Sequence, residues 1–283
     1  MTETARARTL ARDLTRDTTL CISLASRPSR IGTRFHNYLY DLLGLDFAYK
    51  SFATTDLAGA VAGIRALNIR GCGVSMPFKE DIIAMVDELD PSAQAIGSVN
   101  TVVNDNGYLR GYNSDYVAIA SLLRAHHLPA QFSAAVAGSG GMAKAVVAAL
   151  RDHGLTDVVV VARNEATGRA LADRYGYAWI VELGGHCPNL LVNATPVGMA
   201  GGGSPDDLPF DAANVKAART VFDVVASPWR SPLIALAQDR GIPAITGKEV
   251  FEVQAAEQFG LYTGARPSPD QIHEASEFSR SGL

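Results

Sequence analysis

The stretch VAGSGGMAK at residues 136–144 decides the fold of this chain. It follows an apolar run at 133–137 and opens an alanine- and valine-rich segment at 143–150, shortly before Gly154. This succession predicts a strand, a glycine turn and a helix, with Gly154 as the residue that stops the helix.

Three small residues in this stretch have the spacing of a dinucleotide-binding turn. Gly138 permits the tight turn, Gly140 lets a pyrophosphate approach the backbone, and Ala143 lets the helix and the strand pack closely. The helix N-terminus offers N–H groups and a partial positive charge to the phosphates. We therefore expect a dinucleotide site here, whereas an ordinary tight turn is the alternative.

Strands and helices are expected to alternate on both sides of this turn. Strands are expected at 20–24, 47–52, 71–75, 98–103, 108–111, 157–162, 178–181, 190–193, 220–224 and 243–245. Helices are expected at 35–44, 57–67, 78–88, 115–126, 166–175, 232–241, 248–259 and 270–278. The pattern predicts two α/β domains, the second a doubly wound Rossmann-type domain, with the active site in the cleft between them.

The domain boundaries follow from the same pattern. Residues 1–112 together with 249–283 are expected to form the substrate-binding and catalytic domain, with the final helix packed back onto it. Residues 113–248 are expected to form the dinucleotide-binding Rossmann domain. The helical face of 35–44 is predicted to carry Phe35, Tyr38, Leu42 and Leu43.

Composition restricts the class of protein. The 283 residues carry a formal net charge of −4, which gives no general attraction to nucleic acid or to an anionic membrane. No apolar run approaches the roughly 20 residues of a membrane span. Cys21, Cys72 and Cys187 are odd in number and widely spaced, so we expect reduced thiols in a cytoplasmic protein, with no metal site. The arginines of residues 1–18 predict a frayed or helical extension, because acidic residues interrupt them and argue against a transit peptide.

The second strand of the dinucleotide-binding unit indicates which cofactor is bound. An NAD site usually places an acidic residue at the end of this strand to bind the ribose 2′-hydroxyl. Here Arg163 follows the strand, and its guanidinium suits a 2′-phosphate. The sequence thus favours NADP (NADPH) over NAD. The alternative is that Arg163 is a solvated loop residue, and Glu165 nearby weakens the case for a phosphate.

Three polar residues in the first half are candidates for chemistry. Lys79 lies near the start of an expected helix, where its charge opposes the helix dipole. Asn100 lies on a strand, and Asp115 opens a helix. Taken singly, each has a structural explanation: a solvated lysine, a strand-end hydrogen bonder and a helix N-cap.

Six motifs, taken together, resemble those of the shikimate dehydrogenases in order and spacing from about residue 20 to residue 278. They are VSMPFK at 74–79, GSVNT at 97–101, GYNSD at 111–115, the glycine turn at 138–143, NATPVGM at 193–199, and Gly247 followed by QAA at 254–256.

The resemblance implies a role for each matching residue. Lys79 would be the catalytic acid/base and Asp115 its partner, while Asn100 and Gln254 would hold substrate hydroxyls. The residues implied along NADP are Gly138, Ser139, Gly140, Gly141, Met142, Ala143, Arg163, Asn193, Thr195 and Gly247. The implied activity is hydride transfer between nicotinamide and a hydroxylated ring acid, a step of aromatic amino acid biosynthesis, with no partner beyond small molecules.

Several positions depart from the family pattern. Arg30, Ile31 and Gly32 occupy the place of the S-x-S pair that holds the substrate carboxylate, which is the arrangement of the shikimate dehydrogenase-like subgroup. Elsewhere Ser75 replaces a threonine, Tyr116 a glycine, Thr167 an arginine and Ala226 a tyrosine. Two missing hydroxyl donors to a buried carboxylate would cost on the order of 1.5–3 kcal/mol each. The substrate-binding set is therefore Ser75, Asn100, Gln254, Arg30 and Gly32, with weak turnover of shikimate expected.

Other readings remain open from sequence alone. Arg30 either supplies a charged fork for the carboxylate or points into solvent, and Ser26 or Ser29 is the alternative donor. The physiological substrate is shikimate, quinate or another polyol or hydroxy acid. Two further alternatives are a non-catalytic NADP-binding sensor and a lysine-using dehydrogenase of a folate or amino acid. The sequence leaves open whether the protein is a monomer or a homodimer.

Overall fold

The computed structural model describes residues 14–281, so most of the predicted N-terminal extension lies outside the described residues. The chain divides into two compact units, Met1–Ser114 with Gln254–Leu283 (unit 1) and Asp115–Val253 (unit 2). Each unit is described by itself. Within residues 14–281, no helix is long and apolar enough to cross a membrane.

Unit 1 contains a six-stranded mixed sheet in the order β2-β1-β3-β5-β6-β4. The strands are β1 (Thr19–Ala25), β2 (Phe47–Ala53), β3 (Gly71–Val74), β4 (Glu88–Leu89), β5 (Thr101–Asp105) and β6 (Tyr108–Tyr112). β1 is parallel to β2 and β3, whereas β5 is antiparallel to β3 and β6. The β5–β6 turn is the predicted hairpin, because Asn106 and Gly107 adopt the positive φ angles of 54° and 94° that a two-residue turn requires.

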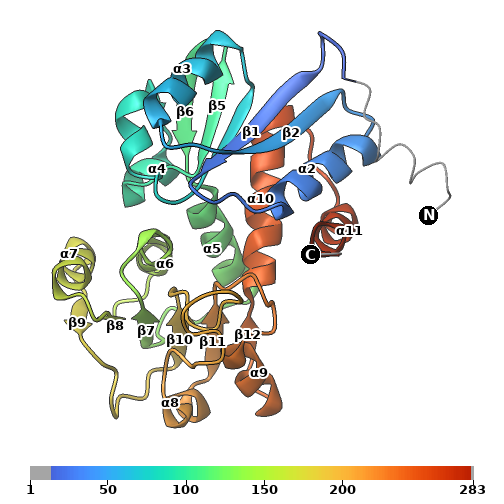
Figure 1. Ribbon diagram of the computed structural model, residues 1–283. Coiled ribbons are helices and arrows are strands. Elements are labelled where there is room, and N and C mark those ends of the chain that lie inside the picture. Colours follow the sequence, from blue (N-terminus) through green and yellow to red (C-terminus); the bar gives the residue numbers. More distant parts are fainter. Residues whose placement is uncertain (1–13, 282–283) are drawn as a thin grey trace. The chain divides into compact units, whose positions relative to one another are not determined.

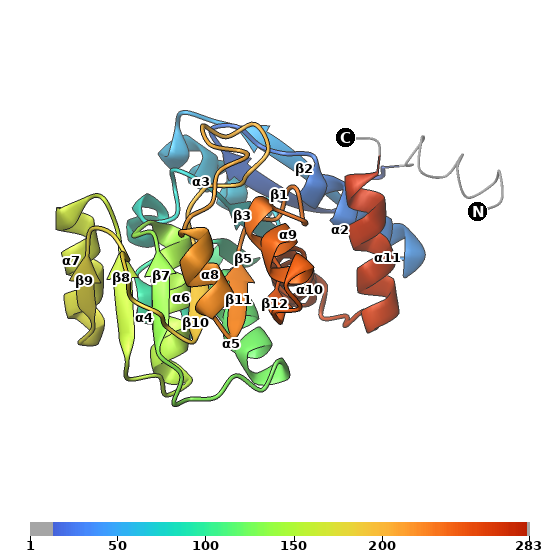
Figure 2. The same ribbon diagram turned by 90° about the horizontal axis from the view of Figure 1, so that it is seen from below.

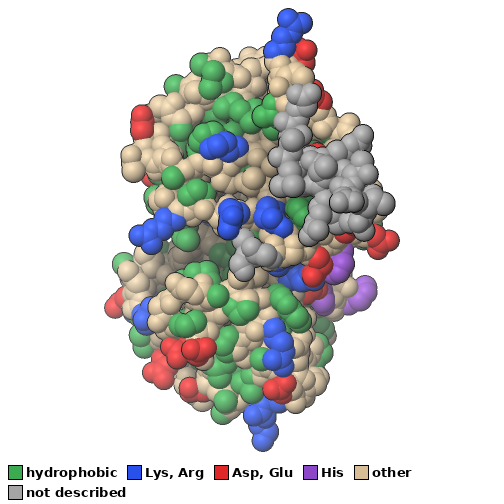
Figure 3. All heavy atoms as spheres, turned by 45° about the vertical axis from the view of Figure 1, so that its right-hand side comes forward, with side chains coloured by type: hydrophobic (Ala, Val, Ile, Leu, Met, Phe, Trp, Pro, Cys, Tyr) green, Lys and Arg blue, Asp and Glu red, His purple; other side chains and the backbone are tan. Residues whose placement is uncertain are grey.

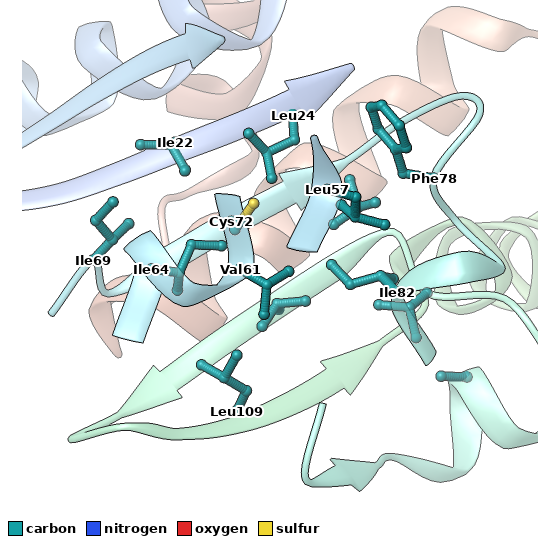
Figure 4. Packing of buried hydrophobic residues seen from close by; sticks show 14 residues of the cluster. Ile22, Leu24, Leu57, Val61, Ile64, Ile69, Cys72, Phe78, Ile82 and Leu109 are labelled. Atoms are coloured by element: carbon teal, nitrogen blue, oxygen red, sulfur yellow. The ribbon is translucent and has the colours of Figure 1, made fainter. Parts of the chain in front are cut away.

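One face of this sheet packs against α3 (Leu57–Ala66), the 3-10 helix η1 (Asp81–Met85) and α4 (Pro91–Ile96). Figure 4 shows Ile22 and Leu24 of β1 facing Leu57 and Val61 of α3 across this core. The predicted apolar face of 57–67 is confirmed except at its end. Leu67 is 73% exposed, because the helix ends at Ala66.

α2 (Ile31–Leu42) packs against β2, and α11 (Pro269–Arg280) lies beside α2 in Figures 1 and 2. α10 (Gly247–Thr263) begins in the last residues of unit 2 and ends in unit 1. The predicted apolar face of α2 is correct at Phe35 but wrong at Leu42, which is 44% exposed. Its place is taken by Leu39 and Tyr40, which are fully buried. The expectation that the tail packs back on the first domain is confirmed, since α11 lies against α2.

The tail is held to α2 by polar and aromatic contacts. Arg34 Nη2 donates to the Phe278 carbonyl at 2.7 Å, and Tyr38 Oη donates to Glu274 Oε1 at 2.5 Å. Tyr38 also packs its ring against Phe278.

The helix predicted at 78–88 is wrong. Residues 76–80 form turns, η1 occupies only Asp81–Met85, and β4 follows. The reason is a long-range hydrogen bond: the Lys79 carbonyl accepts from Val99 N–H at 2.8 Å and not from a residue of its own segment. Pro77 lies in a cis peptide bond with Met76.

Unit 2 contains a six-stranded parallel sheet in the order β12-β11-β10-β7-β8-β9, and Figure 2 shows the strands side by side. The strands are β7 (Ala134–Ala137), β8 (Val158–Val161), β9 (Ala178–Ile180), β10 (Leu190–Asn193), β11 (Thr220–Asp223) and β12 (Ala244–Ile245). The helices are α5 (Ser114–Ala125), α6 (Gly141–Asp152), α7 (Glu165–Tyr175), α8 (Ala212–Ala217) and α9 (Pro232–Asp239). This is the predicted doubly wound arrangement. The short helix α8 of unit 2, and α4 and β4 of unit 1, were not predicted.

The core of unit 2 is apolar on both faces of the sheet, as parallel sheets require. One cluster joins Leu191 and Val221 of the sheet to Leu233 and Ile234 of α9. On the surface, acidic and basic side chains both occur across the face shown in Figure 3, in keeping with the small net charge of −4.

Candidate active site

The candidate substrate-binding residues of unit 1 are grouped around the Asn100 side chain. Asn100 is 3% exposed, and its Oδ1 accepts three hydrogen bonds. The donors are Thr101 Oγ1 at 2.8 Å, Ser114 N at 2.8 Å and Ser114 Oγ at 3.1 Å. Within residues 14–281, no protein group accepts from Asn100 Nδ2. The amide is therefore oriented with its oxygen into the protein and its donor left over for a ligand.

Gln254 joins the same group of residues. It is half-buried in α10, and its Nε2 donates to Ser114 Oγ at 3.2 Å. The structure thus brings Asn100 and Gln254 together through a shared serine, although they are far apart in sequence. A second glutamine, Gln258, lies one turn further along and donates to Thr101 Oγ1 at 2.8 Å. Sequence reasoning missed it.

Lys79 and Ser75 lie in the segment between β3 and η1. Ser75 is exposed, and its backbone N–H donates to the Leu24 carbonyl at 2.9 Å. Lys79 is half-buried, and its backbone is fixed by Val99 as described above. Asp115 directly follows Ser114 in the first turn of α5 and is 7% exposed. A turn in place of a helix removes the dipole argument that first drew attention to Lys79.

The region of the missing serine pair lies at the start of α2. Arg30 is the exposed N-cap of this helix and makes no side-chain capping bond. A Cβ at Gly32 would meet nothing within 4 Å, so a side chain there has room. Ser26 Oγ donates to the Met76 carbonyl at 3.5 Å, and Ser51 Oγ donates to the Ser29 carbonyl at 3.3 Å.

The candidate cofactor-binding residues lie at the carboxyl ends of β7 and β10 in unit 2, where the strand order reverses. Such a switch point is where open α/β sheets bind their ligands. Gly138 has φ 114°, and a Cβ on it would lie 2.8 Å from the Ala194 carbonyl oxygen. Only glycine satisfies both conditions. The strand, glycine turn and helix predicted from the sequence are confirmed.

The next residues of the turn leave space for a ligand. A Cβ on Gly140 or Gly141 would meet no protein atom within 4 Å, so these glycines are not required by the packing of the chain itself. Gly140 is the N-cap of α6 without a side-chain capping bond, whereas Ala143 is fully buried where small size is needed. Both features fit a pyrophosphate close to the backbone. Met142 lies half-buried in the same first turn.

Arg163 lies exposed in the loop after β8. Thr167, at the position of the family's second arginine, bonds Ser139 with 2.7 Å between the two hydroxyl oxygens. Its N–H is capped by Asn164 Oδ1 at 3.1 Å. The substitution at 167 therefore ties α7 to the glycine turn and adds no positive charge.

Asn193 and Thr195 shape the loop after β10. Asn193 is fully buried, and its amide donates to the Val197 carbonyl and to Asp223 Oδ1, both at 3.0 Å. Its Oδ1 accepts from Thr195 Oγ1 at 2.6 Å. These side chains are satisfied by the protein, so their contribution to a cofactor would be the shape of the loop. At Gly247, a Cβ would collide with the Val225 carbonyl.

Asp223 is a buried carboxylate that the sequence analysis did not single out. It accepts from Ser231 Oγ at 2.5 Å and from Val225 N at 3.0 Å, besides Asn193. Burial raises the pKa of this carboxyl from 3.8 to about 6, although its hydrogen bonds oppose the shift. The signal that could have identified it is an acidic residue that ends an otherwise apolar strand.

The raised pKa of Asp223 predicts a pH-dependent stability. A carboxyl whose folded pKa is raised contributes stability that is full below its unfolded pKa and is lost as pH rises through about 6. Asp223→Asn keeps an acceptor and does not titrate. Between about pH 4 and pH 6 the free energy of unfolding of the wild type should therefore fall by on the order of 2 kcal/mol relative to this variant. Urea unfolding of both proteins at several pH values measures this difference, and a constant difference would rule out the raised pKa.

The cysteines of the described residues are free thiols. Cys21 and Cys72 are fully buried, and burial raises the pKa of Cys21 to about 11. Across residues 14–281, no three His, Cys, Asp or Glu side chains are grouped in a way that could hold a metal ion.

Comparison with known proteins identifies the family. Residues 31–102 match the family model described as the shikimate dehydrogenase substrate binding domain. A shikimate dehydrogenase-like protein of Haemophilus influenzae is 53% identical over 268 residues, which cover 95% of this chain and 99% of the relative. The chain belongs to the shikimate dehydrogenase family.

Solved structures of the family agree with this assignment. A shikimate 5-dehydrogenase-like protein superposes with a TM-score of 0.91 at 53% identity, covering 95% of this chain and 100% of the other. The shikimate 5-dehydrogenase of Thermus thermophilus, solved in complex with NADP(H) and shikimate, gives a TM-score of 0.83 at 30% identity, covering 92% and 99%. The predicted resemblance to the shikimate dehydrogenase family and its shikimate dehydrogenase-like members is confirmed.

Proposed function

We propose that this protein is an NADP-dependent dehydrogenase that reduces 3-dehydroshikimate, or a related ring ketone, to the hydroxylated ring acid. Two observations carry the proposal, one in each unit: the oriented Asn100 amide of unit 1, and the open space at Gly140, the N-cap of α6 in unit 2. Family membership supports the same activity. Unit 1 takes the substrate and unit 2 takes NADP.

NADPH supplies the hydride, and the chain supplies position and a proton. Lys79 is the catalytic acid: its ammonium stabilises the negative charge that develops on the carbonyl oxygen and donates the proton. Asp115 is its carboxylate partner. Asn100 Nδ2 donates to a substrate oxygen, and Gln254 and Ser75 bind further hydroxyls.

The carboxylate of the substrate lacks the usual serine pair. Arg30 at the start of α2 is the candidate for its ligand, and the space at Gly32 leaves room for the acid group or a larger substituent. A single charged side chain at an exposed position holds a carboxylate less well than two buried hydroxyl donors. We therefore infer weak turnover of shikimate, with quinate or another cyclic hydroxy acid as the alternative substrate.

The cofactor preference rests on Arg163. Arg163→Ala should raise the KM for NADP by about 10-fold or more, because one charge-assisted hydrogen bond to the 2′-phosphate is lost. The KM for NAD should change little, since NAD lacks that phosphate. Arg240→Ala removes an exposed arginine from the end of α9 and is the matched control. Equal effects of Arg163→Ala on both cofactors would contradict the assignment.

An absorbance screen at 340 nm tests the proposed function as a whole. Shikimate, quinate and related acids are each offered with NADP and with NAD. We expect turnover of at least one acid with NADP, at an efficiency below that of a biosynthetic shikimate dehydrogenase. Binding of NADPH without turnover of any acid would favour a sensor, and full biosynthetic efficiency with shikimate would remove the weak-turnover inference.

A further inference from the structure

Two glutamines of α10 converge on one amide in unit 1. Gln254 and Gln258 are four residues apart and therefore share a face of the helix. Gln254 Nε2 donates to Ser114 Oγ at 3.2 Å, and Gln258 Nε2 donates to Thr101 Oγ1 at 2.8 Å. Both hydroxyls donate in turn to Asn100 Oδ1, at 3.1 Å and 2.8 Å.

Backbone groups fix the orientation of two of these amides: the Ser114 N–H donates to Asn100 Oδ1, and the Asn100 carbonyl accepts from Gln258 Nε2. A glutamine Nε2 can only donate, so each hydroxyl that receives it acts as an acceptor there and directs its own proton elsewhere. The proton of each hydroxyl points to Asn100 Oδ1, which also accepts from Ser114 N at 2.8 Å. If the Asn100 amide were flipped, its Nδ2, which can only donate, would face the Ser114 N–H and the two hydroxyl groups that now donate to Oδ1. The network thus permits one amide orientation.

The end of the network at Gln258 is buried. Gln258 is 7% exposed, and its Nε2 is also within 3.2 Å of the Asn100 carbonyl. Gln258 also interacts with the buried His36 ring, and this interaction opposes the larger effect of burial on the pKa of His36. His36 is 1% exposed and stacks on Tyr49 at 4.4 Å between ring centroids. Burial lowers the pKa of His36 to about 3, so the ring stays neutral near neutral pH.

We propose that Gln258 and Thr101 are positioning residues that set the polarity of Asn100 toward the substrate. The site then presents Asn100 Nδ2 as a donor and Gln254 Oε1 as an acceptor, since the described chain offers neither atom a protein partner. Such a pair selects a ligand with one oxygen that accepts and one hydroxyl that donates, as a diol or a hydroxyl beside a carbonyl does. This inference rests on the proposed function for its kinetic consequence but not for its structural one.

The kinetic test compares Thr101→Val with Thr101→Ser. Valine keeps the shape of threonine without the hydroxyl, whereas serine keeps the hydroxyl. Thr101→Val should lower kcat/KM for the substrate by about 5- to 20-fold, and Thr101→Ser should restore most of it. The Kd for NADPH should not change. In an Asn100→Ala background, Thr101→Val should have less than about a twofold effect, because the residue it positions is gone. An equal loss in both backgrounds would overturn the proposal.

A spectroscopic readout tests the same network without turnover. The side-chain amide pair of Asn100 is assigned in a ¹H–¹⁵N spectrum by its loss in Asn100→Ala. In the wild type the two protons should be sharp and well separated. In Thr101→Val and Gln258→Met they should shift toward the values of a free amide, and in Thr101→Ser they should not. An unchanged Asn100 pair in Thr101→Val would overturn the proposal even if the substrate screen fails, and a shifted pair would support it.

Discussion

Replacing Lys79 by alanine should lower kcat by about 10²-fold or more, with a smaller change in the KM for NADP. The reason is that Lys79 is the group we assign to proton donation at the reacting oxygen, and a positioned general acid contributes on that scale. The backbone around Lys79 is held by the bond from Val99 N–H at 2.8 Å, which the substitution does not remove. The loss should therefore appear in kcat and not in the stability of unit 1.

Lys216→Ala is the matched control for this experiment. Lys216 is exposed in α8 and has no assigned role, and its loss removes the same charge. Steady-state kinetics and a thermal melt of both variants separate the outcomes. A kcat near that of the wild type for Lys79→Ala would remove Lys79 from the acid role, and Asp115 would lose its assigned partner.

Replacing Gly140 by alanine should weaken NADPH binding by about 10-fold or more while leaving the fold intact. A Cβ on Gly140 meets no protein atom within 4 Å, so the methyl group projects only into the space assigned to the pyrophosphate. Fluorescence titration with NADPH measures the Kd, and thermal unfolding measures the stability. In this variant the Kd for NADPH should rise while the unfolding temperature stays close to that of the wild type.

Gly138→Ala provides the contrast. Its φ of 114° and the Ala194 carbonyl 2.8 Å from the added Cβ mean that this variant should lose both stability and NADPH binding. Gly185→Ala, which also meets nothing within 4 Å, is the neutral control in unit 2. Normal NADPH affinity in Gly140→Ala would exclude the glycine turn as the pyrophosphate site.

The parts of the fold that could be predicted from the sequence are those whose conformation depends on residues close together in the chain. The glycine turn, the Asn106–Gly107 hairpin and the apolar strands of unit 2 depend on residues close together in sequence. The segment at 78–88 failed because its conformation depends on Val99, which lies outside any local window. Pro77 had suggested a helix start, and that signal was outweighed by a long-range hydrogen bond.

The candidate site also has residues that the sequence predicts and residues that it does not. Asn100 and Gln254 were predicted as site residues because they stand in motifs of a known family, but the orientation of Asn100 depends on Ser114 and Thr101 acting together. Gln258 carries no local signal, since a glutamine in an amphipathic helix is usually at the surface. Only its burial at 7% and its bond to Thr101 distinguish it.

Transfer of deuterium from NADPH to the substrate tests the central claim most directly. The wild-type protein is incubated with 3-dehydroshikimate and with NADPH deuterated at nicotinamide C4 on each face in turn, and the product is analysed by mass spectrometry. We predict shikimate that carries one deuterium on the carbon bearing the new hydroxyl, from one of the two labelled cofactors and not from the other. Absence of any reduced product, or a product without deuterium from either cofactor, would contradict the assignment of this chain as a dehydrogenase that reduces 3-dehydroshikimate by hydride transfer.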